Sequence, residues 1–148
     1  MARCLEALPD ADAPSARNTW GDGLYFAFTS VTAAAQFSHG LQAALADLAE
    51  QQGGVASQVR LRLALHFGPT TELIDPVTRQ PNVVGTHVSQ AARLEPATAP
   101  GEVYASEAFA ARLMLERHSG FECRYLKNLS WAKSYGVFPT FRLVKTSS

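Results

Sequence analysis

Residues 18–25 read Asn-Thr-Trp-Gly-Asp-Gly-Leu-Tyr, which places one carboxylate, Asp22, between two glycines. Glycine adopts positive φ without strain, so this pattern predicts a tight turn between two short strands, at 17–20 and 24–28. An acidic side chain on a rigid turn is well placed to bind a metal ion. Asp-Gly is also common in hairpins that bind nothing, so the interpretation of Asp22 depends on the rest of the chain.

The downstream segments predict an α+β fold. Ser30 is the expected N-cap of a helix that runs to about Gln52, because apolar residues recur there at helical spacing and two glycines follow. Residues 59–67 alternate apolar and other side chains with a period of two, which predicts a half-exposed strand. The other expected elements are a hairpin arm at 72–81, a strand at 82–84, a helix at 85–95, a strand at 103–105, a helix at 106–116 and two strands near 121–126 and 140–144. This alternation predicts helices packed on a sheet.

The composition is that of one soluble globular domain. The chain has 148 residues, of which 47% are hydrophobic and 18% charged, with 13 basic and 13 acidic side chains. This balance favours neither nucleic acid nor an anionic membrane, and no segment approaches the roughly 20 apolar residues of a membrane span. Cys4 and Cys123 lack the spacing of a zinc site or a disulfide framework, so we expect inert thiols in a cytoplasmic protein.

Five motifs, in chain order, resemble the class III nucleotidyl cyclase domain, the catalytic module of adenylate and guanylate cyclases. They are residues 20–23 (Trp-Gly-Asp-Gly), 61–69 (Leu-Arg-Leu-Ala-Leu-His-Phe-Gly-Pro), 84–94 (Val-Gly-Thr-His-Val-Ser-Gln-Ala-Ala-Arg-Leu), 100–106 (Pro-Gly-Glu-Val-Tyr-Ala-Ser) and 132–136 (Ala-Lys-Ser-Tyr-Gly). The resemblance implies a ferredoxin-like cyclase sandwich, in which helices pack on a mixed, mostly antiparallel sheet.

The resemblance also implies a reaction. Class III cyclases convert a nucleoside triphosphate, ATP or GTP, to a 3′,5′-cyclic monophosphate and release pyrophosphate in intracellular signalling. Two divalent metal ions, Mg²⁺ or Mn²⁺, are held by two aspartates and act on the attacking hydroxyl and the phosphates. The sites of this family lie across a head-to-tail dimer, so the resemblance implies a homodimer.

Residue by residue, the resemblance assigns roles to four side chains. Asp22 falls on the second metal aspartate of the family, and Arg93 on the arginine that contacts the α-phosphate in the transition state. Ser89 lies one helical turn before Arg93, at the position of the asparagine that orients the ribose. Lys133 falls on the lysine that neutralises the β- and γ-phosphates. The resemblance leaves two alternatives for Tyr135, which could shield the site or pack on the sheet.

Asn18 and Asn82 occupy the base-selecting positions. Adenylate cyclases usually carry lysine at the first position and guanylate cyclases glutamate. At the second position adenylate cyclases carry aspartate or threonine, whereas guanylate cyclases carry cysteine. Two amides can donate to and accept from either purine, so the sequence does not choose between ATP and GTP.

The chain departs from the family at its N-terminus. The first metal aspartate of the family belongs to a strand well upstream of the turn, yet only 21 residues precede Asp22. Asp10 and Asp12 lie in a proline-containing stretch and are poor substitutes. We therefore expect residues 1–148 to form a single, incomplete cyclase domain without its first strand, and residues 1–16 to be the remnant of the preceding helix and its connection. The edges left exposed would favour dimerisation or strand exchange.

Two other interpretations stay open. The serine and the two asparagines, together with the missing aspartate, favour a catalytically silent cyclase-like module for dimerisation, regulation or nucleotide binding. Another palm-type phosphoryl-transfer domain is an alternative at the level of fold, against which the helix pattern at 88–94 and the Lys133 loop both argue.

Overall fold

The computed structural model describes residues 9–20, 23–52, 54 and 58–146. Its elements are η1 (Asp10–Asp12), β1 (Ala16–Trp20), β2 (Gly23–Ala27), α2 (Val31–Gln52), β3 (Leu63–Leu65), β4 (Thr71–Ile74), β5 (Pro81–Val84), α3 (Thr86–Leu94), η3 (Glu95–Ala97), β6 (Val103–Ser106), α4 (Glu107–Met114), β7 (Phe121–Trp131) and β8 (Gly136–Lys145). The expected α+β fold is confirmed. The turn with Asp22 and the predicted helical remnant at 1–8 lie outside the described residues.

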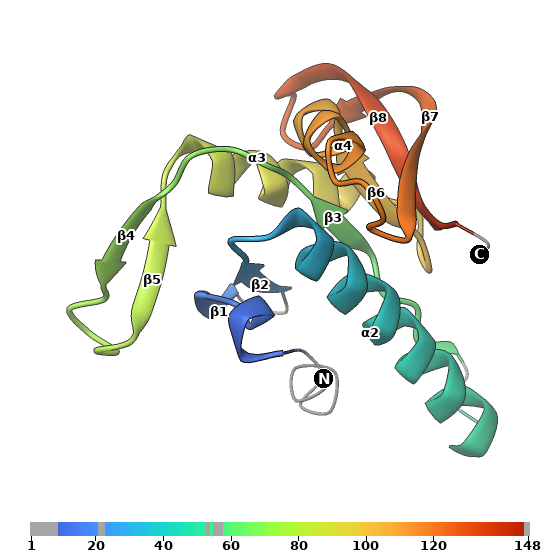
Figure 1. The fold of residues 1–148 in the computed structure, drawn as a ribbon, viewed down its shortest axis with the longest axis horizontal. Coiled ribbons are helices and arrows are strands. Elements are labelled where there is room, and N and C mark those ends of the chain that lie inside the picture. The colour runs from blue at the N-terminus through green and yellow to red at the C-terminus, as the bar shows by residue number, and fades with distance from the viewer. Residues whose placement is uncertain (1–8, 21–22, 53, 55–57, 147–148) are drawn as a thin grey trace.

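The main sheet has four strands in the order β3-β6-β8-β7. β3 and β6 are parallel, whereas β8 is antiparallel to both β6 and β7, so the predicted mixed, mostly antiparallel sheet is confirmed. The pairs β1-β2 and β4-β5 form two separate antiparallel hairpins. In Figure 1 the β4–β5 arm extends away from the main sheet, and α3 lies between the arm and the sheet.

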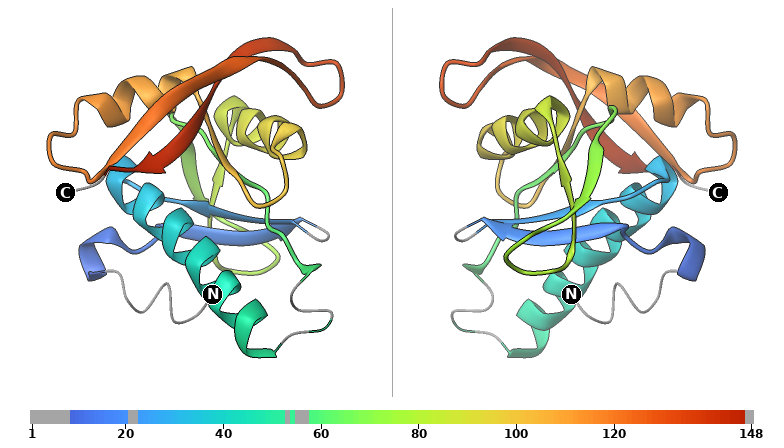
Figure 2. Two further views of the ribbon diagram at one scale, coloured as in Figure 1. Left: turned by 90° about the vertical axis from the view of Figure 1, so that its right-hand side faces the viewer. Right: turned by 90° about the vertical axis from the view of Figure 1, so that its left-hand side faces the viewer.

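Strand β6 separates two hydrophobic clusters, because successive strand residues point to opposite faces. Val103 and Ala105 pack with residues of α2 and α4, including the nearly fully buried Phe109. Tyr104 packs on the other face with Leu94 of α3 and with Trp131 of β7. Helices α2 and α4 therefore cover one face of the sheet, and α3 covers the other. In both views of Figure 2 the β7–β8 hairpin lies above α3.

Both predicted serine caps are present. Ser30 Oγ accepts a hydrogen bond from the backbone N–H of Ala33 at 3.1 Å, at the start of α2. Ser106 Oγ accepts from the N–H of Phe109 at 3.3 Å, at the start of α4. Each bond satisfies a donor that the first helical turn leaves without a partner.

The strand predicted at 59–67 is shorter than expected. Only Leu63–Leu65 is strand, and Val59 and Phe67 are 44% and 43% exposed. Strand β3 pairs with only three residues of β6, 103–105, so the ladder is short. Ala64 packs against the α3 cluster, so β3 itself is covered on both faces. The predicted exposure holds for Arg60 and Arg62, which precede β3.

The two late strands are longer than predicted. β7 continues to Trp131 and β8 begins at Gly136, so these residues pair directly across a four-residue turn. The polar residues in this segment had indicated a loop. Ser130 lies on the exposed side of the hairpin, opposite Val137, whereas Leu129 and Phe138 pair on the packed side. Lys133 and Ser134 belong to the turn itself. One solvated face is common in antiparallel pairs.

Within the described ranges, no helix is both long and apolar enough to cross a membrane.

Replacing the cap of α2 tests this account of the long helix. We expect Ser30→Ala to lower the free energy of unfolding by about 1 kcal/mol, because the N–H of Ala33 loses its acceptor. Urea denaturation measures the change. Ser130→Ala, at an exposed position in β7, is the control and should change stability little. Equal stability of the Ser30→Ala and unsubstituted proteins would contradict the capping role.

Candidate functional site

Helix α3 and the turn between β7 and β8 are joined into one unit. The backbone N–H of Ala132 donates to the carbonyl oxygen of Arg93 at 3.0 Å, and Gln90 Nε2 donates to the hydroxyl of Tyr135 at 3.2 Å. The Arg93 guanidinium lies over the Tyr135 ring, 5.4 Å from its centroid. These contacts flank Lys133 in the sequence, so the structure brings the segments of Arg93 and Lys133 together.

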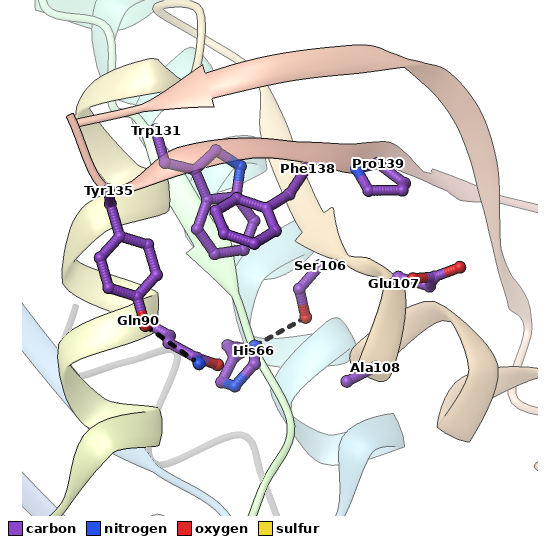
Figure 3. Close-up of a pocket in the computed structure, with 9 residues that line it drawn as sticks. All are labelled: His66, Gln90, Ser106, Glu107, Ala108, Trp131, Tyr135, Phe138 and Pro139. Carbon is purple, nitrogen blue, oxygen red and sulfur yellow. Dashed lines mark hydrogen bonds between the residues drawn. The ribbon is translucent and has the colours of Figure 1, made fainter.

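Aromatic packing holds the end of the hairpin in place. The Trp131 ring is buried, and its centroid lies 4.6 Å from that of Phe138 and 6.4 Å from that of Tyr135. The completely buried Leu94, at the end of α3, belongs to the same cluster. In Figure 3 the Tyr135 side chain points toward Gln90, with the other two rings beside it. Tyr135 therefore packs on α3, and large rings in defined contacts leave the turn little freedom to move.

The tip of this hairpin has an unfavourable backbone. Lys133 and Ser134 have φ values of 58° and 53°, a left-handed conformation that destabilises a residue with a Cβ by about 1–2 kcal/mol. Both residues are exposed, so packing of their own side chains does not offset this cost. Backbone strain of this kind concentrates at functional sites, where the surrounding structure enforces it. The turn is therefore a candidate site on geometry as well as on sequence.

A second group links Asn18 of β1 to Asn82 of β5 through Tyr25. Asn18 and Tyr25 are directly opposite in the β1–β2 hairpin, so their side chains share a face. The Tyr25 hydroxyl donates to Asn82 Oδ1. Each asparagine Oδ1 also accepts from the next backbone N–H, at 2.8 Å from Thr19 and 2.9 Å from Val83. Because a backbone N–H only donates, these bonds fix which end of each amide is the oxygen.

A third group is formed by His66, His87 and Ser106. His66 Nδ1 lies 2.8 Å from Ser106 Oγ, and His66 Nε2 lies 2.8 Å from His87 Nδ1. The two imidazole rings are stacked, with centroids 5.1 Å apart. A pocket of about 130 Å³ opens beside His66, with Glu107 and Tyr135 also in its lining. Burial, and to a lesser degree the neighbouring His87, lowers the pKa of His66 from 6.5 to about 4.

Comparison with known proteins shows which solved structures share this architecture. No protein-family model matches the chain, and no curated protein matches it significantly. Among solved structures, an adenylate cyclase from Trypanosoma brucei superposes with a TM-score of 0.67 at 19% identity, over 96% of this chain and 76% of that chain. The adenylyl cyclase CyaB from P. aeruginosa superposes with a TM-score of 0.63 at 15% identity, over 90% and 73%.

A third structure extends the likeness to guanylate cyclases. The guanylate cyclase domain of RhGC from Catenaria anguillulae, solved in complex with GTP, gives a TM-score of 0.56 at 15% identity, over 79% of this chain and 60% of that chain. This chain has the class III nucleotidyl cyclase fold. The resemblance that the five motifs had indicated is thereby confirmed at the level of fold.

The cyclase fold places the remaining predicted residues as follows. Ser89 is exposed on α3, one turn before the half-buried Arg93. Asp22 lies outside the described residues, while Asp12 lies in η1. In the described part of the chain no three His, Cys, Asp or Glu side chains come together as a metal site. The described residues do not by themselves fit a two-metal centre.

Several partners in this cyclase fold were missed by reasoning from the sequence. Tyr25 had a readable signal, because the pairing of β1 with β2 in a close hairpin makes it the cross-strand partner of Asn18. Gln90 had none, since its contact with Tyr135 spans 45 positions and depends on how α3 packs. The same is true of the His66–His87 contact, which joins the end of β3 to the first turn of α3.

The lowered pKa of His66 makes stability depend on pH. Between pH 6.5 and about 4 the unfolded chain binds a proton at His66 that the folded chain does not, so the free energy of unfolding should fall as pH falls through this window. His66→Gln should flatten the curve, as measured by urea denaturation from pH 4 to 8. His39→Gln, at an exposed histidine, is the control. Parallel curves for the unsubstituted protein and His66→Gln would contradict this account.

Proposed function

We propose that this chain is the catalytic domain of a nucleotidyl cyclase, which converts ATP or GTP to a 3′,5′-cyclic nucleotide and pyrophosphate in intracellular signalling. The observation that carries the proposal is the unit of α3 and the β7–β8 turn, to which both Arg93 and Lys133 belong. Cations on a pre-organised support suit a triphosphate whose charge shifts during cyclisation. The GTP complex of a protein with this fold supports a nucleotide as the ligand.

Arg93 is well arranged to bind a phosphate. Its guanidinium uses its face against Tyr135, which leaves the N–H groups at its edge for oxygen acceptors. The ion pairs among the described residues involve Arg62, Arg112, Arg124 and Arg142, and none involves Arg93. In the proposed reaction Arg93 stabilises the α-phosphate. Lys133 acts on the β- and γ-phosphates as a point charge, and Ser89 donates a hydrogen bond to the ribose.

Asn18 and Asn82 form the proposed base-binding end. Asn82 Oδ1 already accepts from both Tyr25 and the N–H of Val83, so Asn82 offers its NH₂ group to a purine. Asn18 Oδ1 accepts only from the N–H of Thr19, so Asn18 offers its NH₂ group and one remaining acceptor lone pair. Such donors suit the carbonyl oxygen of guanine and the ring nitrogens of either base. The NH₂ group of Asn82 does not suit the amino group of adenine, which itself donates. Both ATP and GTP remain in the proposal. The difference between the two bases in hydrogen-bond donors and acceptors is what the test of Asn82 below uses.

We further propose a homodimer and a single cyclase domain over residues 1–148. Sites shared between subunits would let the phosphate-binding group of one chain meet the base-binding group of its partner. Asp22 would supply one carboxylate to Mg²⁺ or Mn²⁺, ions that prefer oxygen ligands. Light scattering measures the association, and a dimer is the expected species.

A catalytically silent, nucleotide-binding or regulatory module is the second candidate. The observation that favours it is Ser89, whose hydroxyl replaces a longer amide at the proposed ribose contact. Measuring both nucleotide binding and product distinguishes the two candidates, because the silent module would bind a nucleoside triphosphate without forming a cyclic product.

Removing the proposed phosphate-binding cations tests the function directly. The full-length natural protein is incubated with ATP or GTP and Mg²⁺ or Mn²⁺, and cyclic product is measured by chromatography. We expect Arg93→Ala to lower kcat by about 10²- to 10³-fold, since it removes a charge placed for the transition state. Lys133→Ala should also lower activity. Arg117→Ala and Lys127→Ala, both at exposed positions, are the matched controls. An active protein that tolerates Arg93→Ala would overturn the assignment.

Changing one amide to a carboxylate tests the base-binding end. Asn82→Asp keeps an acceptor for Tyr25 and for the N–H of Val83, and adds a second oxygen that can accept from the adenine amino group. We expect the ratio of kcat/KM for ATP to that for GTP to rise by about tenfold. Asn128→Asp, at an exposed position in β7, should leave the ratio unchanged. An unchanged ratio in Asn82→Asp would remove this residue from the base-binding end.

A further inference from the structure

Three side chains connect three elements on the α3 side of the sheet. The backbone N–H of Phe109 donates to Ser106 Oγ, the cap of α4. The same oxygen contacts Nδ1 of His66, which follows β3, and Nε2 of His66 contacts Nδ1 of His87 in the first turn of α3. At 2.8 Å one of the two facing nitrogens carries the hydrogen and the other accepts it. The result is a continuous hydrogen-bonded chain from α4 to α3.

The start of α3 has few other means of attachment. Its N-cap is Gly85, which has a φ of 134° and makes no side-chain capping bond, and its first turn has no acidic residue. The one buried residue of this nine-residue helix is Leu94, at the far end. That end is also tied to the β7–β8 turn through the carbonyl oxygen of Arg93. The two ends of α3 are therefore held differently, and the bond between His87 and His66 is the described side-chain hydrogen bond that ties the first turn to the strand side.

Gly68 makes room for this contact. A Cβ built at Gly68 would lie 2.1 Å from His87 Nδ1, so the imidazole ring occupies the space that any larger residue would need. The backbone at Gly68 does not have a positive φ. The glycine is therefore needed for space and not for its conformational freedom.

We propose that His66 and His87 are a positioning pair, whose hydrogen bond fixes the first turn of α3 and with it the direction in which Ser89 and Arg93 are presented. The catalytic part of this inference rests on the proposed cyclase function. Neither imidazole needs to touch the substrate. Without this bond the described side-chain contacts of α3 lie from Gln90 toward Leu94, so its first turn could shift, and a small displacement of a catalytic group lowers a rate strongly.

Amide hydrogen exchange of residues 86–90 tests the attachment without any assay of activity. Gly68→Ala should raise exchange in this segment by about tenfold, because the new methyl group displaces the His87 ring. Gly40→Ala makes the same chemical change in α2, where a Cβ meets nothing within 4 Å, and should leave α3 unchanged. If Gly68→Ala leaves exchange in α3 as it was, the proposal is wrong.

Substitution of His87 separates the hydrogen bond from ring packing. His87→Phe keeps a flat ring but loses the bond, and should raise exchange in residues 86–90 about as much as Gly68→Ala. His87→Gln can still bond to His66 and should restore part of the protection. Equal exchange in His87→Phe and the unsubstituted protein would show that the ring only fills space, which would overturn the proposal.

Kinetics in the full-length protein then tests presentation of the catalytic groups. We expect His87→Phe to lower kcat about ten- to a hundredfold with little change in KM, and His87→Gln to recover part of the loss. Faster exchange in α3 with an unchanged kcat would contradict the positioning role. A complete absence of cyclase activity in the unsubstituted protein would instead overturn the proposed function, and the exchange results would still decide whether the pair anchors α3.

Discussion

The packing of α3 against the β7–β8 turn is the contact on which the candidate site depends. Leu94 and Trp131 are buried together, and Tyr135 lies between the tryptophan ring and the Arg93 guanidinium. This packing keeps Lys133 and Ser134 in a left-handed backbone that neither residue favours. Without it, Arg93 and Lys133 would belong to two independent segments, and a shared phosphate site would have no structural basis.

The two faces of β6 explain why α3 can serve this purpose. Val103 and Ala105 contribute to the core under α2 and α4, so most of the hydrophobic stabilisation lies on that side of the sheet. The face of Tyr104 carries a smaller cluster with a single short helix. Because α3 is not enclosed on all sides, it can be exposed at Ser89 and still be attached through a few polar contacts such as His66–His87.

Elements that depend on neighbouring residues in the sequence were predicted well. The hairpin of β1 and β2, the Ser30 and Ser106 caps and the helix of Arg93 all depend on residues within a few positions of one another. Strand lengths were predicted less well. The turn at 132–135 lacks the Asn-Gly pattern of tight hairpins, so its polar residues suggested a longer loop. Residues 59–62 alternate like a strand but have no partner of matching length.

The sequence by itself determined the order of elements and the five motifs, because these follow from spacing along the chain. The residues proposed for phosphate and base follow from the resemblance of those motifs to the cyclase family. Only the tertiary structure decided which of these residues lie in contact. Tyr25 joins Asn18 to Asn82, Tyr135 joins the helix of Arg93 to the turn of Lys133, and His66 meets His87. The physical reason is that such contacts depend on how separate elements pack, and a single sequence carries no direct record of that packing.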